Sequence, residues 1–281
     1  MEQKKNWTDA FTSLDRRYIF VLVALAVIIP LLAGLKGSVN ISPSVRSVYD
    51  YINDLKPGDS VMIVLDYDPA SEAELYPMTL ALYRHCLDRQ LHILSFTMWP
   101  NGAALTERAF DKMKLEYKPK GIDIVSGVDY VNFGYQVGGA LVIIAAGQDL
   151  RNAMPTDYRG NSTGSMPILD GINSLRDINY VIDLAAGSTI DWWVAYGVQR
   201  YHFVLGAGCT AVSATQYYPY LNTGQINGLI GGLKGAAEYE QLAGHPERGL
   251  AGMTAQSSVH ALIALMVIVA NAFYFMSGKK R

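Results

Sequence analysis

Acidic side chains follow a short apolar run early in the middle part of the chain. Asp66 and Asp68 come directly after Ser60–Leu65, which reads SVMIVL and predicts a buried strand. Carboxylate oxygens suit hard divalent cations, so Asp66 and Asp68 are candidate metal ligands, and a divalent cation is the one cofactor that the residues suggest. An acid at a strand end that caps the following helix is the alternative interpretation.

Polar and small residues follow two later apolar runs. Asp183 lies near the end of the run Asn179–Leu184, and a small-residue stretch follows the run His202–Leu205. Ligands of open parallel sheets bind beyond the carboxyl ends of the strands, so residues at these ends are candidates for binding. The ligand-binding candidates are Asp66, Asp68, Asp183, Ser188, Thr189, Gly206, Gly208, Cys209 and Thr210.

The stretch Gly206–Thr210 predicts a glycine-rich loop in which backbone N–H groups could approach an anion. Ala211 takes the place of the third glycine of a dinucleotide fingerprint, and no acid follows it until Glu238. The lysine of a phosphate-binding P-loop is also missing. Nucleotide binding is therefore weakly supported.

No complete catalytic constellation is present. Cys209 would need a nearby histidine to act as a nucleophile, and none of the histidines is well placed by sequence. A small buried residue and a disulfide with Cys86 are the alternatives for Cys209. The catalytic residues stay unknown, although the carboxylates of Asp66, Asp68 and Asp183 keep a metal-dependent hydrolase open.

The elements that must position these residues alternate between strands and helices. Alternation of this kind predicts an α/β fold with a Rossmann-like, doubly wound, mainly parallel sheet of roughly five strands. The predicted strands cover 60–65, 91–97, 139–146, 179–184 and 202–205. The predicted helices cover 45–55, 71–89, 103–117, 189–200 and 223–242, and the polar segment 149–174 predicts a long loop, functional or mobile.

Small residues recur every four positions in the last predicted helix, 223–242. Gly228, Gly232 and Ala236 form one row, and Gly231 and Gly235 form another. Rows of this kind let a second backbone approach closely, so they predict a packing interface with the sheet or with a second copy.

Two apolar segments of 18 residues without a charged side chain flank this middle part, at 18–35 and 259–276. Each is about 27 Å long as a helix, which matches the hydrocarbon core of a bilayer. Asn271 inside the second segment favours a hydrogen bond to another helix. The expected organisation is a cytoplasmic N-terminus (1–17), a transmembrane helix (18–35), an α/β domain (36–250), a second transmembrane helix with its lead-in (251–277) and a basic tail (278–281).

The charges indicate which side of the membrane each part occupies. The 281 residues are 50% hydrophobic and 17% charged, with a net charge of −2. The ends, 1–36 and 279–281, carry +5, and the middle carries −7. The positive-inside rule therefore predicts a cell-membrane protein with both termini in the cytoplasm and an extracytoplasmic domain. An acidic domain also argues against nucleic acid as a partner.

Three segments of the middle part resemble an uncharacterised prokaryotic family of two-pass membrane proteins with an extracytoplasmic α/β domain. They are 183–187 (DLAAG), 207–214 (AGCTAVSA) and 231–239 (GGLKGAAEY). The resemblance implies the membrane-anchored arrangement. It implies nothing about an activity, because none is assigned to the family. We therefore expect a membrane protein that binds a small ligand or a protein partner, as a homo-oligomer or a subunit of a membrane assembly. A membrane-anchored, metal-dependent hydrolase is the alternative.

Overall fold

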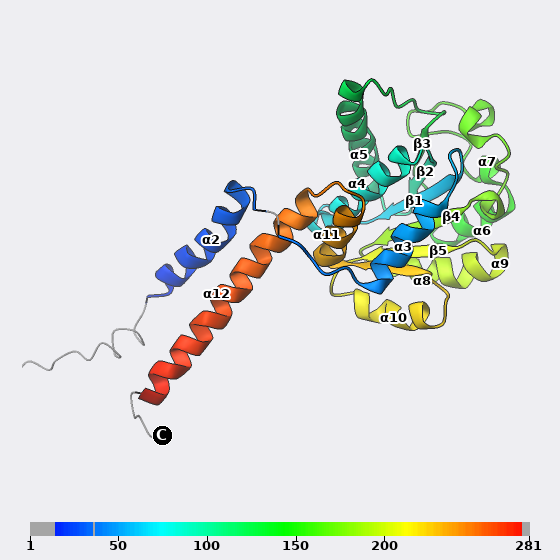
Figure 1. Cartoon of the computed structure of the whole chain (residues 1–281). Helices are drawn as coiled ribbons and strands as arrows, with labels where there is room; N and C mark the ends of the chain where they lie inside the picture. The colour runs from blue at the N-terminus through cyan, green and yellow to red at the C-terminus, as the bar shows by residue number, and fades with distance from the viewer. Residues whose placement is uncertain (1–14, 36, 277–281) are drawn as a thin grey trace, which may run out of the picture. The chain divides into compact units, whose positions relative to one another are not determined.

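The protein is described here by a computed structural model that covers residues 15–35 and 37–276 (Figure 1). The chain divides into two compact units. One is the α/β domain, residues 38–250, and the other combines the described residues of the two ends of the chain, 15–35, 37 and 251–276.

A six-stranded sheet forms the centre of the α/β domain. All of its strands are parallel, and their order is β3-β2-β1-β4-β5-β6. This order defines a doubly wound sheet that reverses direction between β1 and β4, so the predicted Rossmann-like α/β fold is confirmed. The strands are β1 (Ser60–Asp66), β2 (His92–Thr97), β3 (Tyr130–Tyr135), β4 (Tyr180–Ala185), β5 (Leu205–Cys209) and β6 (Gly228–Gly231).

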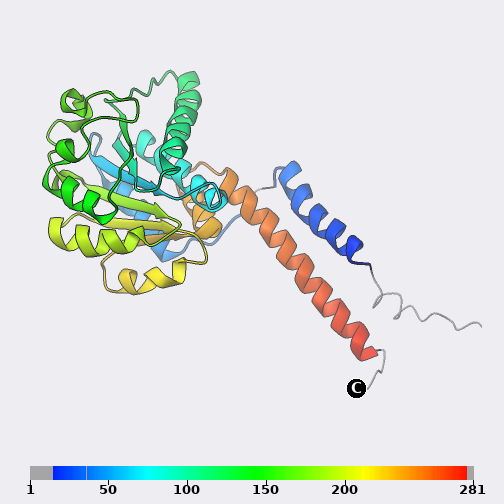
Figure 2. The same ribbon diagram turned by 180° about the vertical axis from the view of Figure 1, so that it is seen from behind.

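Helices cover both faces of the sheet, as Figures 1 and 2 show from opposite sides. Side chains alternate along each strand, so each face has its own apolar core. One face packs against α3 (Pro43–Asp54), α4 (Glu72–Asp88), α5 (Gly102–Tyr117) and α11 (Gly232–Leu242). The other packs against α6 (Ala140–Gln148), α7 (Leu150–Ala153), α8 (Thr189–Trp192), a π-helical turn (Trp193–Val198), α9 (Gln199–Tyr201) and α10 (Ala214–Asn222).

The predicted strand over 139–146 is wrong, because this segment forms helix α6. Short apolar runs fit a buried strand and a buried helix equally well, and the periodicity could not separate them. The strand that the prediction missed is β3, so the sheet has six strands and not five. The segment 149–174 is not an open loop either, because α7 and two 3-10 turns form in it. Leu150, Ile168 and Leu169 of this segment are buried in the core.

The chain from 202 to 242 also differs from its prediction. The strand β5 begins at Leu205, so Gly206, Gly208 and Cys209 belong to a buried strand and not to a loop. The range 223–242, predicted as a single helix, contains the strand β6 followed by helix α11, and helix α10 ends just before it. Glycine-rich sequence lowers the apolar periodicity that distinguishes strand from helix, which explains the error.

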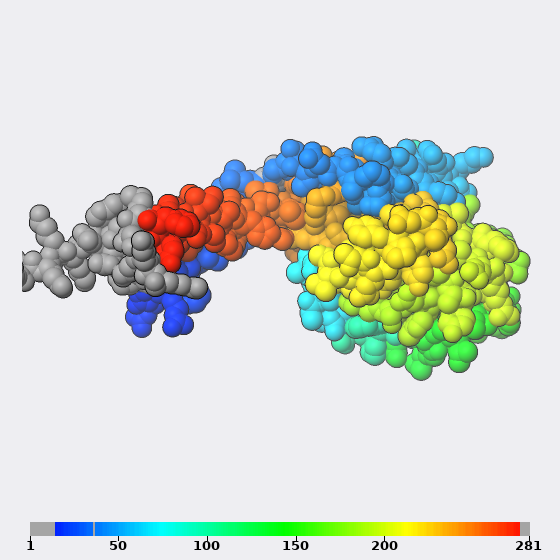
Figure 3. Space-filling view, turned by 90° about the horizontal axis from the view of Figure 1, so that it is seen from below, coloured from blue at the N-terminus to red at the C-terminus, as the bar shows by residue number. Residues whose placement is uncertain are grey.

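The predicted glycine rows therefore serve packing inside the domain. A Cβ on Gly228 would lie 2.5 Å from Val48 Cγ2 and 2.7 Å from the Ser44 carbonyl oxygen, both of α3. Gly231 and Gly232 face Ala214 and Ala211, and Gly235 packs on Ile230. Their small size lets α3, α10 and α11 approach the β5–β6 half of the sheet. In Figure 3, α3 (blue) and α10 (yellow) accordingly lie side by side on the surface, although they are far apart in sequence.

The end segments each contain a helix. Among the helices of residues 15–35 and 37–276, only α12 (Arg248–Met276) is both long and apolar enough to cross a membrane, and an 18-residue window of it has a mean hydropathy of 2.0. The N-terminal segment forms α2 (Arg16–Leu32), a helix of 17 residues that Asp15 caps. Asn271 donates from Nδ2 to the carbonyl oxygen of Val267 in its own helix (2.8 Å), and its expected hydrogen bond to another helix stays a prediction.

A charged network joins α4, α5 and the segment before α12. The guanidinium of Arg84, whose side chain is 5% exposed, pairs with Glu116 at 2.8 Å and with Glu247. Partial burial alone would raise the pKa of both carboxyl groups, but Arg84 and Lys112 outweigh it and lower the pKa of each. The network therefore stabilises the fold while both glutamates are ionised.

We expect this network to make stability depend on pH below neutrality. The folded pKa of each glutamate lies below its unfolded value of about 4.3, so the stabilisation is present above that pH and is lost as the pH falls through the folded pKa. In thermal unfolding of the full chain in mild detergent, Arg84→Met should lower the midpoint at pH 7. Between pH 7 and pH 3 the midpoint of this variant should fall by less than the midpoint of the wild type. Equal acid sensitivity of the two proteins would contradict this assignment.

Gly228→Ala tests the close approach of β6 and α3. The added methyl group would meet backbone and side-chain atoms of α3 at 2.5–2.9 Å, so we expect about 1–3 kcal/mol of destabilisation. Gly164→Ala is the matched control, because a Cβ there meets only Ser162 Oγ at 3.5 Å. Thermal or denaturant unfolding measures both variants, and equal stabilities would refute the packing role of Gly228.

Candidate functional site

Two buried carboxyl groups lie on the two central strands. Asp66 ends β1 and Asp183 lies in β4, and both side chains are 0% exposed. The register pairs Val64 with Asp183 and Asp66 with Ala185, so the acids are offset by two residues and project from the same face of the sheet. They flank the point where the strand order reverses, which is where doubly wound folds bind ligands.

The two carboxyl groups have few hydrogen-bond partners. Asp66 Oδ1 accepts from the backbone N–H of Met98 (2.6 Å) and from Thr97 Oγ1 (3.2 Å). Asp66 Oδ2 and both oxygens of Asp183 have none, and the buried hydroxyl of Thr189 has none either. Buried polar groups in native proteins are nearly always hydrogen-bonded, so this cluster is unusual.

Burial makes it costly for either acid to ionise. It raises the pKa of Asp66 to about 7, against the hydrogen bonds from Met98 and Thr97 that favour the charged form. Burial, with the nearby charge of Asp66, holds the pKa of Asp183 well above its usual range. Acids with strongly shifted pKa values, such as these two at the carboxyl ends of central strands, are common at functional sites.

The other strand-end candidates lie apart from this pair. Asp68 Oδ1 accepts from the backbone N–H of Ala70 (3.0 Å) in a turn, and Asp68 is not among the buried acids without a hydrogen-bond partner. Ser188 is exposed and precedes α8 without a side-chain capping bond, and Thr210 donates to Ser213 Oγ (3.2 Å). No group of three or more His, Cys, Asp or Glu side chains that could hold a metal occurs in the part of the chain that the structure describes.

The glycines of β5 make room for side chains and not for an anion. A Cβ on Gly206 would lie 2.0 Å from Tyr180 Oη, and one on Gly208 would lie 2.3 Å from Leu184 Cδ2. The connection from β1 to α4, where Rossmann folds place a phosphate, has no glycine and carries Glu72 and Glu74 in the first turn of the helix. Neither strand β5 nor the β1–α4 connection therefore has the features of a dinucleotide site.

Cys209 is an unreactive thiol in this environment. It is buried and free, as is Cys86, so the two do not form a disulfide. Burial, followed by the charges of Glu74 and Asp183, raises the pKa of Cys209 to about 12. Within the described residues no hydrogen bond joins it to a histidine: His85 contacts Tyr239, and His245 contacts Asp88. The arrangement does not support a nucleophilic role.

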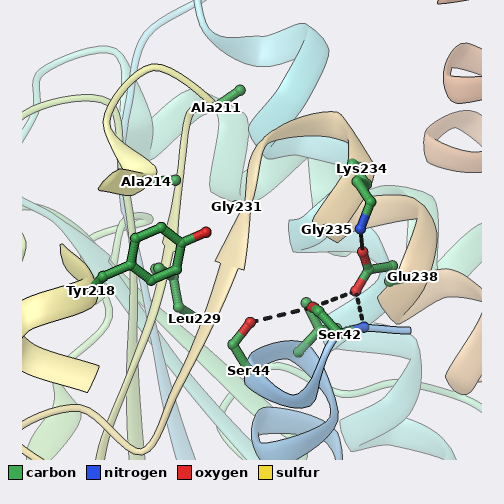
Figure 4. Close-up of a pocket in the computed structure, with 11 residues that line it drawn as sticks. Ser42, Ser44, Ala211, Ala214, Tyr218, Leu229, Gly231, Lys234, Gly235 and Glu238 are labelled. Carbon is green, nitrogen blue, oxygen red and sulfur yellow. Dashed lines mark hydrogen bonds and ion pairs between the residues drawn. The ribbon is translucent and has the colours of Figure 1, made fainter. Parts of the chain in front are cut away.

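A cavity of about 270 Å³ opens beyond the carboxyl ends of β5 and β6 (Figure 4). Its walls come from the first turns of α3, α10 and α11, which the small residues of β6 allow to converge. The lining residues are Ser42, Ser44, Val45, Ala211, Ala214, Tyr218, Leu229, Gly231, Lys234, Gly235 and Glu238.

A buried acid and an exposed base stand together on the cavity wall. Glu238 is 1% exposed, and its Oε2 accepts from the backbone N–H of Ser42 (2.7 Å) and from Ser42 Oγ (2.6 Å). Its Oε1 pairs with Lys234, whose side chain is 58% exposed. Figure 4 shows this chain of contacts running from Ser44 through Ser42 and Glu238 to Lys234. The wall therefore presents both signs of charge and two hydroxyl groups.

No protein-family model, curated protein or solved structure matches this chain. The geometry defines the class of the domain, a six-stranded parallel Rossmann-like α/β fold. This class hosts many unrelated functions, so the function has to follow from the cavity and the side chains.

Proposed function

We propose that the chain is a membrane-anchored binding protein whose α/β domain takes a small zwitterionic ligand. The observation that carries this proposal is the cavity at the carboxyl ends of β5 and β6, with Lys234 and Glu238 on its wall. Small-molecule sites combine an apolar lining with a few converging polar groups at this edge of the sheet.

The chemistry of the wall fits a ligand that carries both charges. Lys234 has further N–H donors for a carboxylate, and the hydroxyl oxygens of Ser42 and Ser44 on the same wall have lone pairs for an ammonium group. Val45 and Leu229 supply an apolar surface. A volume of about 270 Å³ is at the lower end for ligand pockets, which limits the ligand to the size of an amino acid.

Hydrolysis is less well supported than binding. Asp66 and Asp183 are fully buried, and Asp68 lies in a separate turn, so the three carboxyl groups do not face a substrate together. We therefore propose binding and no reaction.

Ala211→Tyr should block the cavity, because Ala211 is an exposed residue of its lining. A panel of free amino acids, inorganic phosphate and a neutral polyol is added to the full chain in mild detergent, and thermal midpoints are measured. We expect at least one amino acid to raise the wild-type midpoint by about 2–5 °C and to leave Ala211→Tyr unchanged.

Val212→Tyr is the control, because Val212 is 85% exposed and does not line the cavity. It should respond like the wild type. A response to phosphate or polyol alone, no response at all, or an equal response of Ala211→Tyr would each reject the zwitterion site.

Membrane anchoring is the second part of the proposal. Its support is the length and hydropathy of α12 and the apolar sequence of α2. With basic residues outside both apolar segments, we propose that both helices cross the cell membrane, with the termini in the cytoplasm and the acidic domain outside. The expected homo-oligomer or membrane assembly stays a prediction, since the glycines that motivated it pack inside the domain.

Labelling with a membrane-impermeant maleimide tests this orientation. Ser165→Cys places an exposed thiol on the α/β domain, and the native Cys86 and Cys209 are buried. We expect labelling of Ser165→Cys in intact spheroplasts, and labelling of a cysteine added after Arg281 only once the membrane is permeabilised. The reverse pattern would show that the domain faces the cytoplasm.

A further inference from the structure

The buried polar cluster at the centre of the sheet lacks a counter-charge. Asp66, Asp183 and Thr189 are each at most 1% exposed. Three of their four carboxyl oxygens and the threonine hydroxyl have no hydrogen-bond partner. Over the described ranges, 15–35 and 37–276, no basic side chain forms an ion pair with either acid. Burying two carboxylates without compensation would cost several kcal/mol for each.

The hydroxyl group of Thr189 belongs to the same buried cluster as the two acids. Thr189 Oγ1 lies close enough to both carboxyl groups to favour their ionised forms, yet it meets the geometry of a direct hydrogen bond with neither. Buried polar groups that make no direct hydrogen bond are commonly bridged by a third atom, a water or an ion. Here that atom would have to satisfy oxygens that can only accept.

The orientation of Asp66 points to the same place. Met98 N–H and Thr97 Oγ1 both donate to Oδ1 of Asp66, which leaves Oδ2 without a partner, like both oxygens of Asp183. Ligating carboxylates in metal sites are held by second hydrogen bonds of this kind, which fix the direction of the free oxygen.

We propose that Asp66, Asp183 and Thr189 bind one hard divalent cation, Mg²⁺ or Ca²⁺, between β1, β4 and α8. Two carboxylates balance the charge of a divalent cation, and a donor set made only of oxygen suits hard cations. Two carboxylates are a usual protein contribution to a Mg²⁺ site, in which water fills other positions. This site is separate from the cavity that Glu238 and Lys234 line and does not depend on the ligand proposed for it.

A cation at this site would connect the two central strands, β1 and β4, to the start of α8. Asp66 and Asp183 come from neighbouring strands, and Thr189 begins the helical segment that continues into the π-helical turn Trp193–Val198. Local π-helical turns are frequent at functional sites. A cation held there would tie this segment to both strands.

The test uses the full chain purified in mild detergent. Metal content is measured by mass spectrometry of the elements, and thermal midpoints are recorded after chelation and after addition of Mg²⁺ or Ca²⁺. We expect about one equivalent of cation per chain, and a midpoint that rises by roughly 5–10 °C at a hundredfold excess over Kd.

Three variants locate the effect. Asp183→Asn and Thr189→Val should fold, as judged by circular dichroism. We expect each variant to bind the cation at least tenfold more weakly than the wild type, as measured by the cation concentration needed to raise the midpoint. Asp68→Asn is the matched control, because Asp68 caps an exposed turn nearby and should bind as the wild type does.

Two results would overturn the proposal. One is a wild type that contains no bound metal and shows no cation-dependent shift of its midpoint. A higher midpoint of Asp183→Asn would then indicate that the two acids form a protonated pair. The other is loss of the shift in Asp68→Asn to the same extent as in Asp183→Asn, which would place the cation outside the buried cluster.

Discussion

The burial of two carboxyl groups on the central strands is the constraint around which the rest of the domain is organised. An ionised carboxylate loses several kcal/mol of solvation on burial, and a domain of this size is stable by only about 5–15 kcal/mol. Asp66 and Asp183 lie side by side at 0% exposure, so the fold can retain them only if the charge is neutralised or the acids are protonated.

The segments above this pair are tightly fitted. A Cβ on Gly187 would lie 2.9 Å from the Trp99 ring, and one on Gly102 would lie 2.3 Å from the Leu65 carbonyl oxygen. Both glycines follow or face the carboxyl ends of central strands. Their lack of a side chain brings the β2–α5 and β4–α8 connections down over the acids and excludes bulk water from them. The same closeness keeps a substrate away, which is why burial favours a binding or structural role for the acids.

The two halves of the sheet differ in side-chain size, and the cavity follows from this difference. Strands β1, β2 and β4 carry large apolar residues on both faces, whereas β5 and β6 contain glycines where helices or tyrosine and leucine side chains approach. The first turns of α3, α10 and α11 consequently meet at the end of β6. The polar residues of these three helices then form the wall of the cavity, although they are far apart in the sequence and belong to no single motif.

The sequence predicted the elements whose apolar pattern is strong. β1, β2 and β4 and helices α3–α5 lie within a few residues of their expected places, because long or evenly patterned segments are the most reliable. Asp66, Asp183 and Thr189 were found because strand ends are predictable. Glu238 was missed as a site residue because its partner, Ser42, is 196 positions away, and only the folded sheet brings α3 beside α11.

Helix α10 connects the two sites physically. Tyr218 lines the cavity, while its neighbour Tyr217 donates from its hydroxyl to the carbonyl oxygen of Gly187 (2.8 Å), two residues before Thr189. Tyr220 of the same helix donates to Asp191 Oδ1 (2.7 Å) in α8. These two hydrogen bonds join the helix that lines the cavity to residues on either side of Thr189, so the same contacts position α10 and hold the start of α8 in place.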